Sequence, residues 1–245
     1  MAFSGADLRL FEKFLDRNPL LAFDFDGTLA PIVKKRTRAR MRPITRRLLK
    51  QAARDYRVAI VTGRSVADAR AKTRGVPGLL YIGNHGAEIG SRYLVSPAKA
   101  REWRRILQRR LRGVQGADIE FKKFSISVHF IQSRDKIFAE KAIREALREL
   151  RGASVVGGKH VFNVVDPRAP GKGGALDILM RKRKFSHAIF FGDDVTDEDA
   201  FALSRRRVLS VKIGKRGKTR AKLVLKNQRE IDGVLKLIVK RSKRV

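Results

Sequence analysis

The fold is decided by one stretch, Leu20-Leu21-Ala22-Phe23-Asp24-Phe25-Asp26-Gly27-Thr28-Leu29. It begins with an apolar run without charge, which is typical of a strand buried on both faces of a parallel sheet. Asp24 and Asp26 then end the strand with two carboxylates, at the edge where open α/β sheets bind their ligands. Gly27 permits a sharp turn there. Taken alone, the stretch also fits an ordinary turn after a core strand, because Asp-Gly is a common turn pair.

A second acidic cluster favours a functional interpretation of the first. It follows the apolar run at residues 187–191 and reads Asp193-Asp194-Val195-Thr196-Asp197-Glu198-Asp199. Carboxylates gathered at two strand ends repel one another unless a cation lies between them. Hard oxygen ligands of this kind suit Mg²⁺, so the two clusters together predict a magnesium site.

The composition predicts a globular protein with a full core. The chain has 245 residues, of which 43% are hydrophobic, and it has no cysteine, which excludes disulfides and thiolate metal sites. No apolar segment has the form of a signal peptide or the length of a membrane span. We therefore expect a cytoplasmic protein without membrane insertion.

The charge balance is strongly basic. Against 24 Asp and Glu stand 57 Lys and Arg, which gives a formal net charge of +33. Such an excess predicts non-specific adhesion to polyanions at low salt. The basic residues are spread along almost every segment, and none of the usual nucleic-acid-binding motifs is present, so specific nucleic-acid recognition is not expected. The sequence leaves the oligomeric state open.

Strands and helices alternate at both ends of the chain, which predicts a Rossmann-like α/β core with a parallel sheet and right-handed crossovers. In the first part, strands are expected at 20–25, 58–61 and 79–83, and helices at 8–16, 43–55 and 66–74, the last capped by Ser65. In the last part, strands are expected at 187–191, 208–213 and 223–225, and helices at 172–182, 197–204 and 229–239.

Between these parts the pattern changes. Helices are expected at 97–112 and 135–150, and strands at 119–121, 124–131, 154–156 and 160–165, with Gly157-Gly158 as a hairpin turn. This order predicts an antiparallel sheet with helices on one face. The expected organisation is a core of residues 1–90 and 169–245 with an inserted α+β cap of residues 91–168.

Four strand-end motifs resemble those of the haloacid-dehalogenase-like phosphotransferases: Asp24-x-Asp26-Gly-Thr28, Thr62-Gly63-Arg64, Lys172-Gly173 and Gly192-Asp193-Asp194. Two longer blocks are similar to those of the trehalose-6-phosphate phosphatases, namely Gly83-Asn84-His85-Gly86-Ala87-Glu88 and Gly192-Asp193-Asp194-x-Thr196-Asp197-Glu198. The matching blocks extend from about residue 20 to residue 201. The resemblance implies a Mg²⁺-dependent phosphatase that releases trehalose and phosphate from trehalose 6-phosphate.

The resemblance also implies roles for individual residues. Asp24 is the expected nucleophile, which forms an aspartyl-phosphate, and Asp26 the general acid and base. Thr62 and Lys172 would stabilise the phosphoryl group during transfer. The metal residues implied are Asp24, Asp26 through its backbone carbonyl, Asp193 and, in a supporting position, Asp194. Substrate contacts are expected from Gly63, Arg64, Asn84, His85, Glu120, Lys122 and Asn163.

Asn163 departs from the family pattern, because some members carry a glutamate there. An amide can still form a hydrogen bond with a sugar hydroxyl. Two alternatives stay open from the sequence. One is a phosphatase for another sugar phosphate, such as sucrose or mannosylglycerate phosphate. The other is a basic nucleic-acid-associated protein built on an inactive phosphatase core.

Overall fold

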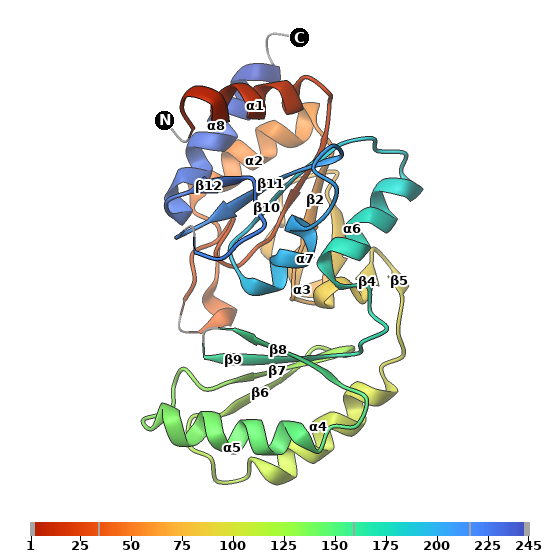
Figure 1. Cartoon of the computed structure of the whole chain (residues 1–245), viewed down its shortest axis with the longest axis vertical. Coiled ribbons are helices and arrows are strands. Elements are labelled where there is room, and N and C mark those ends of the chain that lie inside the picture. The colour runs from red at the N-terminus through yellow and green to blue at the C-terminus, as the bar shows by residue number, and fades with distance from the viewer. Residues whose placement is uncertain (1–2, 34, 159, 216, 243–245) are drawn as a thin grey trace. The chain divides into compact units, whose positions relative to one another are not determined.

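A computed structural model describes residues 3–33, 35–158, 160–215 and 217–242. The chain forms two compact units (Figure 1). The core unit comprises Met1–Gly90 and Gly171–Val245, and the cap unit comprises Ser91–Pro170. The second boundary therefore lies after Pro170 rather than after residue 168.

The core unit is built on a mixed sheet whose strands follow the order β12-β11-β10-β1-β2-β3-β4. All neighbouring pairs are parallel except β3 with β4, which is antiparallel. The strands are β1 Leu20–Phe23, β2 Val58–Val61, β3 Leu80–Gly83, β4 Glu88–Ile89, β10 Ala188–Gly192, β11 Val208–Ile213 and β12 Leu223–Leu225. The predicted fold class, an α/β protein with a parallel-sheet core, is confirmed.

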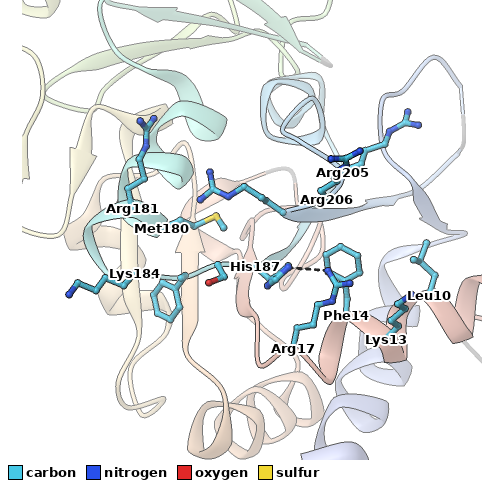
Figure 2. Close-up of a pocket in the computed structure, with 13 residues that line it drawn as sticks. Leu10, Lys13, Phe14, Arg17, Met180, Arg181, Lys184, His187, Arg205 and Arg206 are labelled. Carbon is cyan, nitrogen blue, oxygen red and sulfur yellow. Dashed lines mark hydrogen bonds between the residues drawn. The ribbon is translucent and has the colours of Figure 1, made fainter.

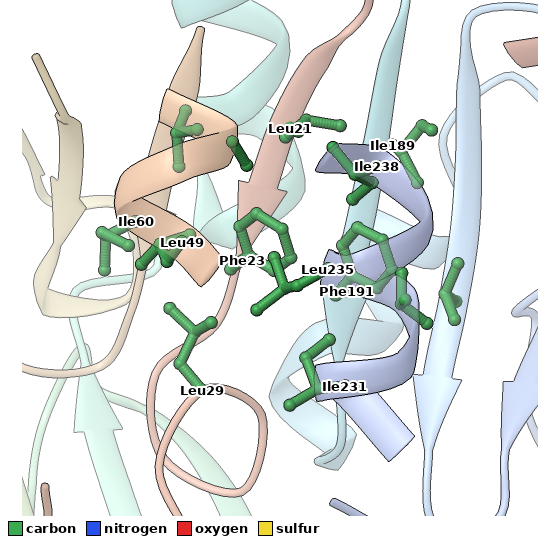
Figure 3. Close-up of a cluster of buried hydrophobic side chains, with 14 of the residues drawn as sticks. Leu21, Phe23, Leu29, Leu49, Ile60, Ile189, Phe191, Ile231, Leu235 and Ile238 are labelled. Carbon is green, nitrogen blue, oxygen red and sulfur yellow. The ribbon is translucent and has the colours of Figure 1, made fainter. Parts of the chain in front are cut away.

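Helices cover both faces of this sheet, which explains why its central strands are continuously apolar. One face packs against α1 Gly5–Leu15, α2 Pro43–Asp55, α3 Val66–Lys72 and α8 Ile231–Ser242. The other packs against α6 Gly171–Lys182 and α7 Glu198–Phe201. Figure 3 shows the first face, where Phe23 and Phe191 from adjacent strands stack with ring centroids 4.6 Å apart. Leu235 and Ile238 of α8 lie over the same face.

The cap unit is an antiparallel sheet in the order β6-β7-β9-β8, with two helices. Its elements are β5 Arg92–Tyr93, α4 Ala98–Arg110, β6 Asp118–Phe121, β7 Ser125–His129, α5 Lys136–Arg148, β8 Ser154–Gly158 and β9 Val161–Val165. Alternate strand residues such as Ile126, Val128 and Val164 pack against Trp103 of α4 and Ile143 of α5. The opposite face of the sheet carries the polar side chains of Glu120, Ser127 and Asn163 together with Val161 and Val165 of β9.

Two local predictions were wrong, and two short strands were missed. Gly157 and Gly158 do not form the hairpin turn but pair within β8 with Phe162 and Val161. The helix expected at 197–204 is shorter, with a 3₁₀ turn at Val195–Asp197 followed by α7. The short strands β4 and β5 were not predicted, since two residues carry no detectable alternation. Short 3₁₀ turns also occur at Arg36–Arg38, Asn84–Gly86 and Gln228–Glu230.

Across the described part of the chain, no helix combines the length and apolar character needed to cross a lipid bilayer.

Candidate active site

The acidic residues that follow β1 and β10 meet around one buried lysine. Asp24 comes directly after β1, is 4% exposed, and donates its backbone N–H to the carbonyl of Phe191 at 2.8 Å. Lys172, in the first turn of α6, is 3% exposed. Its Nζ lies 2.9 Å from Asp24 Oδ1 and 2.7 Å from Asp197 Oδ1. Burial disfavours the charged lysine, but the carboxylates of Asp197 and Asp24 outweigh it and raise the pKa of Lys172.

Asp197 organises the loop after β10, a role that the sequence did not predict. Its Oδ2 accepts the backbone N–H groups of Asp193 and Asp194, both at 3.0 Å, while its Oδ1 faces Lys172. The side chain is wholly buried. Gly192 is required beside it, because a Cβ at that position would collide with the carboxylate of Asp197. The aspartate five residues after Gly192 is the sequence signal for this arrangement.

Three carboxylates form the most crowded acidic group of the described residues. Asp24, Asp193 and Asp197 each offer an oxygen, and these oxygens lie within 4.8 Å of one another. Burial raises the pKa of Asp24 to about 7; Lys172 opposes this, and Asp197 and Asp26 add to it. Burial also raises the pKa of Asp193 well above its usual value, with added repulsion from Asp24 and Asp197. Negative charge on this cluster is therefore destabilised by burial and by repulsion between the carboxylates.

The donor set of this cluster fits a hard divalent cation. All its ligand atoms are carboxylate oxygens, the donors that Mg²⁺ prefers. Asp193 Oδ1 is buried, and no hydrogen-bond partner for it is found in the described part of the chain. Gly27, with φ of +85°, leaves room for this carboxylate, since a Cβ there would collide with Asp193. A cation coordinated by Oδ1 of Asp193 would reduce the repulsion among the carboxylates and would give this oxygen a partner.

Asp26 and Asp194, the other two expected metal residues, direct their carboxylates elsewhere. Asp194 Oδ1 accepts the backbone N–H of Val195 at 2.7 Å and caps the 3₁₀ turn at Val195–Asp197. The side chain of Asp26 is 40% exposed and is held by Arg64, whose Nε and one Nη lie 2.6 and 2.7 Å from its two oxygens.

Arg64 is almost fully occupied by these contacts. Its other Nη donates to Asp68 Oδ2 at 2.5 Å, and the carbonyl of Arg36 accepts a further bond at 2.9 Å. Burial opposes the charge on Arg64, but the bonds to Asp26 and Asp68 outweigh it and raise its pKa. In this structure Arg64 binds the second carboxylate of the first motif, and its contact with substrate stays a prediction.

The segments after β2 and β3 enclose the next part of the site. Thr62 is 1% exposed, and its Oγ accepts the N–H of Arg64 at 3.2 Å. The carbonyl of Thr62 accepts the N–H of His85 at 3.2 Å. The imidazole of His85 lies over Gly63, where a Cβ would come within 2.5 Å of the ring.

Asn84 and His85 both adopt the left-handed conformation, with φ of 49° and 53°. Such strain in consecutive non-glycine residues is typical of functional sites. Gly86 follows with φ of 95°, and a Cβ there would collide with the carbonyl of Gly171, which itself has φ of 69°. This close approach brings the loop after β3 against the start of α6, next to Lys172.

The three cap residues expected to contact a sugar share one face of the cap sheet. The register places Glu120 opposite Ser127, and Ser127 opposite Asn163. Lys122 Nζ donates to Ser127 Oγ at 2.7 Å and lies 3.3 Å from Glu120 Oε2. Ser127 Oγ in turn donates to Asn163 Oδ1 at 2.6 Å. The polar face of the cap therefore carries a connected set of donors and acceptors.

The chain resembles known proteins over most of its length. The family model for trehalose-phosphatase matches residues 22–228. The probable trehalose-phosphate phosphatase D of Arabidopsis thaliana is 29% identical over 240 residues, which covers 84% of this chain and 63% of that protein. The chain thus spans less than two thirds of the length of this relative.

Two solved structures resemble the chain over nearly their whole length. The C-terminal domain of a Candida albicans trehalose-6-phosphate phosphatase superposes with a TM-score of 0.81 at 22% identity, covering 98% of this chain and 99% of that one. A trehalose-6-phosphate phosphatase related protein gives a TM-score of 0.76 at 26% identity and covers 92% and 99%. From the extent of the family match, the chain belongs to the trehalose-phosphatase family.

Proposed function

We propose that this protein hydrolyses trehalose 6-phosphate to trehalose and inorganic phosphate, with Mg²⁺ and through an aspartyl-phosphate on Asp24. The observation that carries the proposal is a group of four charged residues in a member of this family: Asp24, Lys172 and Asp197 are buried and joined by hydrogen bonds, and the half-buried Asp193 brings a third carboxylate close to those of Asp24 and Asp197. Burying several charged groups together costs folding free energy, which is expected at a catalytic site rather than in a structural core.

Asp24 is the nucleophile in this scheme. Its Oδ2 attacks phosphorus while Oδ1 stays with Lys172, whose Nζ lies 2.9 Å from Oδ1. Lys172 and the hydroxyl of Thr62 offer positive charge and a donor for the oxygens of the transferring group. Mg²⁺, held by Asp24 and Asp193 with the carbonyl of Asp26, would neutralise the charge between carboxylate and phosphate.

Asp26 moves the proton. It protonates the sugar oxygen as it leaves and later accepts a proton from the water that attacks the aspartyl-phosphate. To do so it must release the bidentate contact with Arg64, so the bound pair is a resting arrangement. Arg64 remains anchored by Asp68 and by the carbonyl of Arg36, and is available to receive Asp26 again.

The cap unit provides the selectivity. A disaccharide exposes many hydroxyl groups, and its recognition needs several fixed donors and acceptors. Glu120, Lys122 and Asn163 supply both kinds on one face of the cap sheet. We expect the cap to close over the sugar and so exclude bulk water from the phosphoryl step.

The proposal is tested by phosphate release from a panel of substrates, each with Mg²⁺ and with EDTA. Trehalose 6-phosphate, sucrose 6-phosphate, glucose 6-phosphate and mannosylglycerate phosphate form the panel. We expect the highest kcat/KM for trehalose 6-phosphate, and loss of turnover in EDTA. Equal rates for all four sugar phosphates would contradict the proposed selectivity for trehalose 6-phosphate. Full activity in EDTA would contradict the proposed requirement for Mg²⁺. No turnover of any of them would favour a binding protein on an inactive core.

A further inference from the structure

A cationic basin lies at the opposite edge of the core sheet from the acidic cluster. Asn18, Arg57, His187 and Arg207 closely precede β1, β2, β10 and β11 respectively. These strands are parallel, so the residues before them share one edge of the sheet. Asp24 follows β1, six residues after Asn18, which at about 3.3 Å per residue separates the two edges by roughly 20 Å.

Two adjoining cavities form this basin. The larger has a volume of about 840 Å³, and the smaller about 250 Å³. They share Arg17, Lys184, Phe185 and Ser186, so one continuous depression contains both. We call it the amino-edge basin. Figure 2 shows its larger part, where α1, the segment after α6 and the segment before β11 converge around His187.

Many of the residues that line the amino-edge basin are cations. Lys13 and Arg17 come from the α1 region, Arg181 and Lys184 from the end of α6, and three consecutive arginines from residues 205–207. Arg57 adds a further cation in the smaller cavity. No acidic residue lines either cavity in the described chain. The neighbouring carboxylate is Asp177, which pairs with Arg181 and Arg207 and so offsets only part of the charge.

Apolar side chains also line the larger cavity, and we refer to this apolar part of the lining as its floor. Leu10, Phe14, Met180 and Phe185 contribute to it. Arg17 lies 5.4 Å from the centre of the Phe14 ring and donates to His187 Nε2 at 3.0 Å. Because an arginine can only donate, neutral His187 carries its proton on Nδ1. Arg17 is therefore held at the junction of the two cavities, which share it, with its position fixed from two sides.

These features together define the class of ligand. Fixed arginines and a lysine suit phosphate oxygens, while the apolar floor suits a flat ring. A volume of about 840 Å³ is within the range of small-molecule sites. Inorganic phosphate would leave the floor uncovered. A nucleic-acid strand would need a groove that follows its backbone over many nucleotides. A ring joined to several phosphates uses both parts of the basin.

We propose that the amino-edge basin binds a nucleoside di- or triphosphate, with its phosphates at Arg17, Arg57 and Lys184 and its base against the apolar floor. The proposal does not depend on the activity proposed above, because it involves none of the residues around Lys172.

Calorimetric titration with ATP, tripolyphosphate and adenosine at physiological salt tests it. We expect ATP to bind wild-type protein at least about tenfold more tightly than either of the other two, since each fills only one part of the basin. Tripolyphosphate binding as tightly as ATP would show general adhesion to a basic protein and would overturn the proposal. This comparison needs no variant.

Variants locate the site. Arg57→Gln combined with Lys184→Gln removes two exposed cations from the basin, and we expect ATP affinity to fall at least about tenfold. The matched control, Arg101→Gln with Arg105→Gln, removes two exposed cations from α4 in the cap unit and should change affinity less than about twofold. An equal loss of ATP affinity in both double variants, or no loss in either, would overturn the proposal. Circular dichroism checks that both pairs are folded.

Discussion

The two edges of the core sheet carry opposite charges, although the same strands reach both. At the carboxyl edge, Asp24, Asp193 and Asp197 are crowded around Lys172. At the amino edge, numerous cations surround an open basin, and many of them are exposed. Buried charges must be few and individually paired, whereas exposed charges can accumulate because water screens them. What distinguishes the proposed reaction site from the proposed anion-binding surface is therefore whether the charged side chains are buried and paired or exposed, and not how many there are.

The largest expected effect is at the carboxyl edge. Asp24→Asn keeps the shape of the side chain but removes the nucleophile, so we expect kcat for trehalose 6-phosphate to fall at least about 10³-fold. Steady-state phosphate release measures this. The control is the amino-edge pair Arg57→Gln with Lys184→Gln, which should retain activity within about twofold because exposed cations contribute little at this distance. Residual turnover of Asp24→Asn above a tenth of wild type would contradict the nucleophile assignment.

Removal of Lys172 should affect stability as well as rate. Lys172→Met leaves the carboxylates of Asp24 and Asp197 without their buried partner, and we expect the free energy of unfolding to fall by about 3–5 kcal/mol. Added Mg²⁺ should restore part of the loss, because a cation replaces some of the missing charge. Urea unfolding with and without Mg²⁺ measures both effects. A loss no larger than that of the exposed amino-edge pair, expected within about 0.5 kcal/mol, would show that burial does not distinguish the two edges.

A smaller effect is expected in the cap unit, where charges bind rather than react. If Glu120 binds a sugar hydroxyl as proposed, Glu120→Gln weakens that hydrogen bond, and KM should rise about tenfold while kcat changes little. Initial rates over a range of trehalose 6-phosphate concentrations separate the two constants. Glu140→Gln on α5, whose partner is Arg144 on the helix surface, serves as the matched control. Loss of kcat without a change in KM would instead place Glu120 in the chemical step.

The smallest expected effect is on the pH dependence of the free energy of unfolding in metal-free protein, to which the two edges contribute with opposite signs. The pKa of Asp24 is raised from 3.8 to about 7, so the folded chain holds more protons there and stability falls as pH rises through this range. Burial, with Arg17 and Arg207, lowers the pKa of His187 below 6.5, so stability falls as pH drops below 6.5. Urea unfolding in EDTA from pH 4.5 to 8 tests both. Asp24→Asn and His187→Gln should each remove one slope, and curves parallel to wild type would contradict the assignment.

The architecture was predictable because its signals are strong and local. Apolar runs that end in Asp24 and Asp193 indicate buried parallel strands with a site at one edge, and the structure has this sheet. Ser65 caps α3 as expected, accepting the N–H of Asp68 at 3.2 Å. By contrast, the two-residue strand β4 has too little sequence to reveal its alternation.

Side-chain orientation was much harder to predict than position. The sequence places Arg64 in the second strand-end motif, but its contact with Asp26 of the first motif depends on rotamers and on Asp68 one helical turn away. Asp197 reads as an ordinary acid in a helical first turn, and only the three-dimensional structure shows it buried against Lys172. The amino-edge basin combines residues from distant segments, such as Arg17, Arg57 and Lys184, and no local pattern could indicate it.

The close approach of Gly86 to Gly171 limits how this protein can be re-engineered. The cap unit ends at Pro170, and the next two residues are Gly171, with its left-handed backbone, and Lys172. A foreign cap could be grafted as a cassette to change the accepted sugar, but the splice must leave this glycine in place. Moving the junction one residue further would force a side chain at position 171 against the carboxylate of Asp199 and disturb the start of α6, where Lys172 supplies the ammonium group on which the neighbouring carboxylates depend.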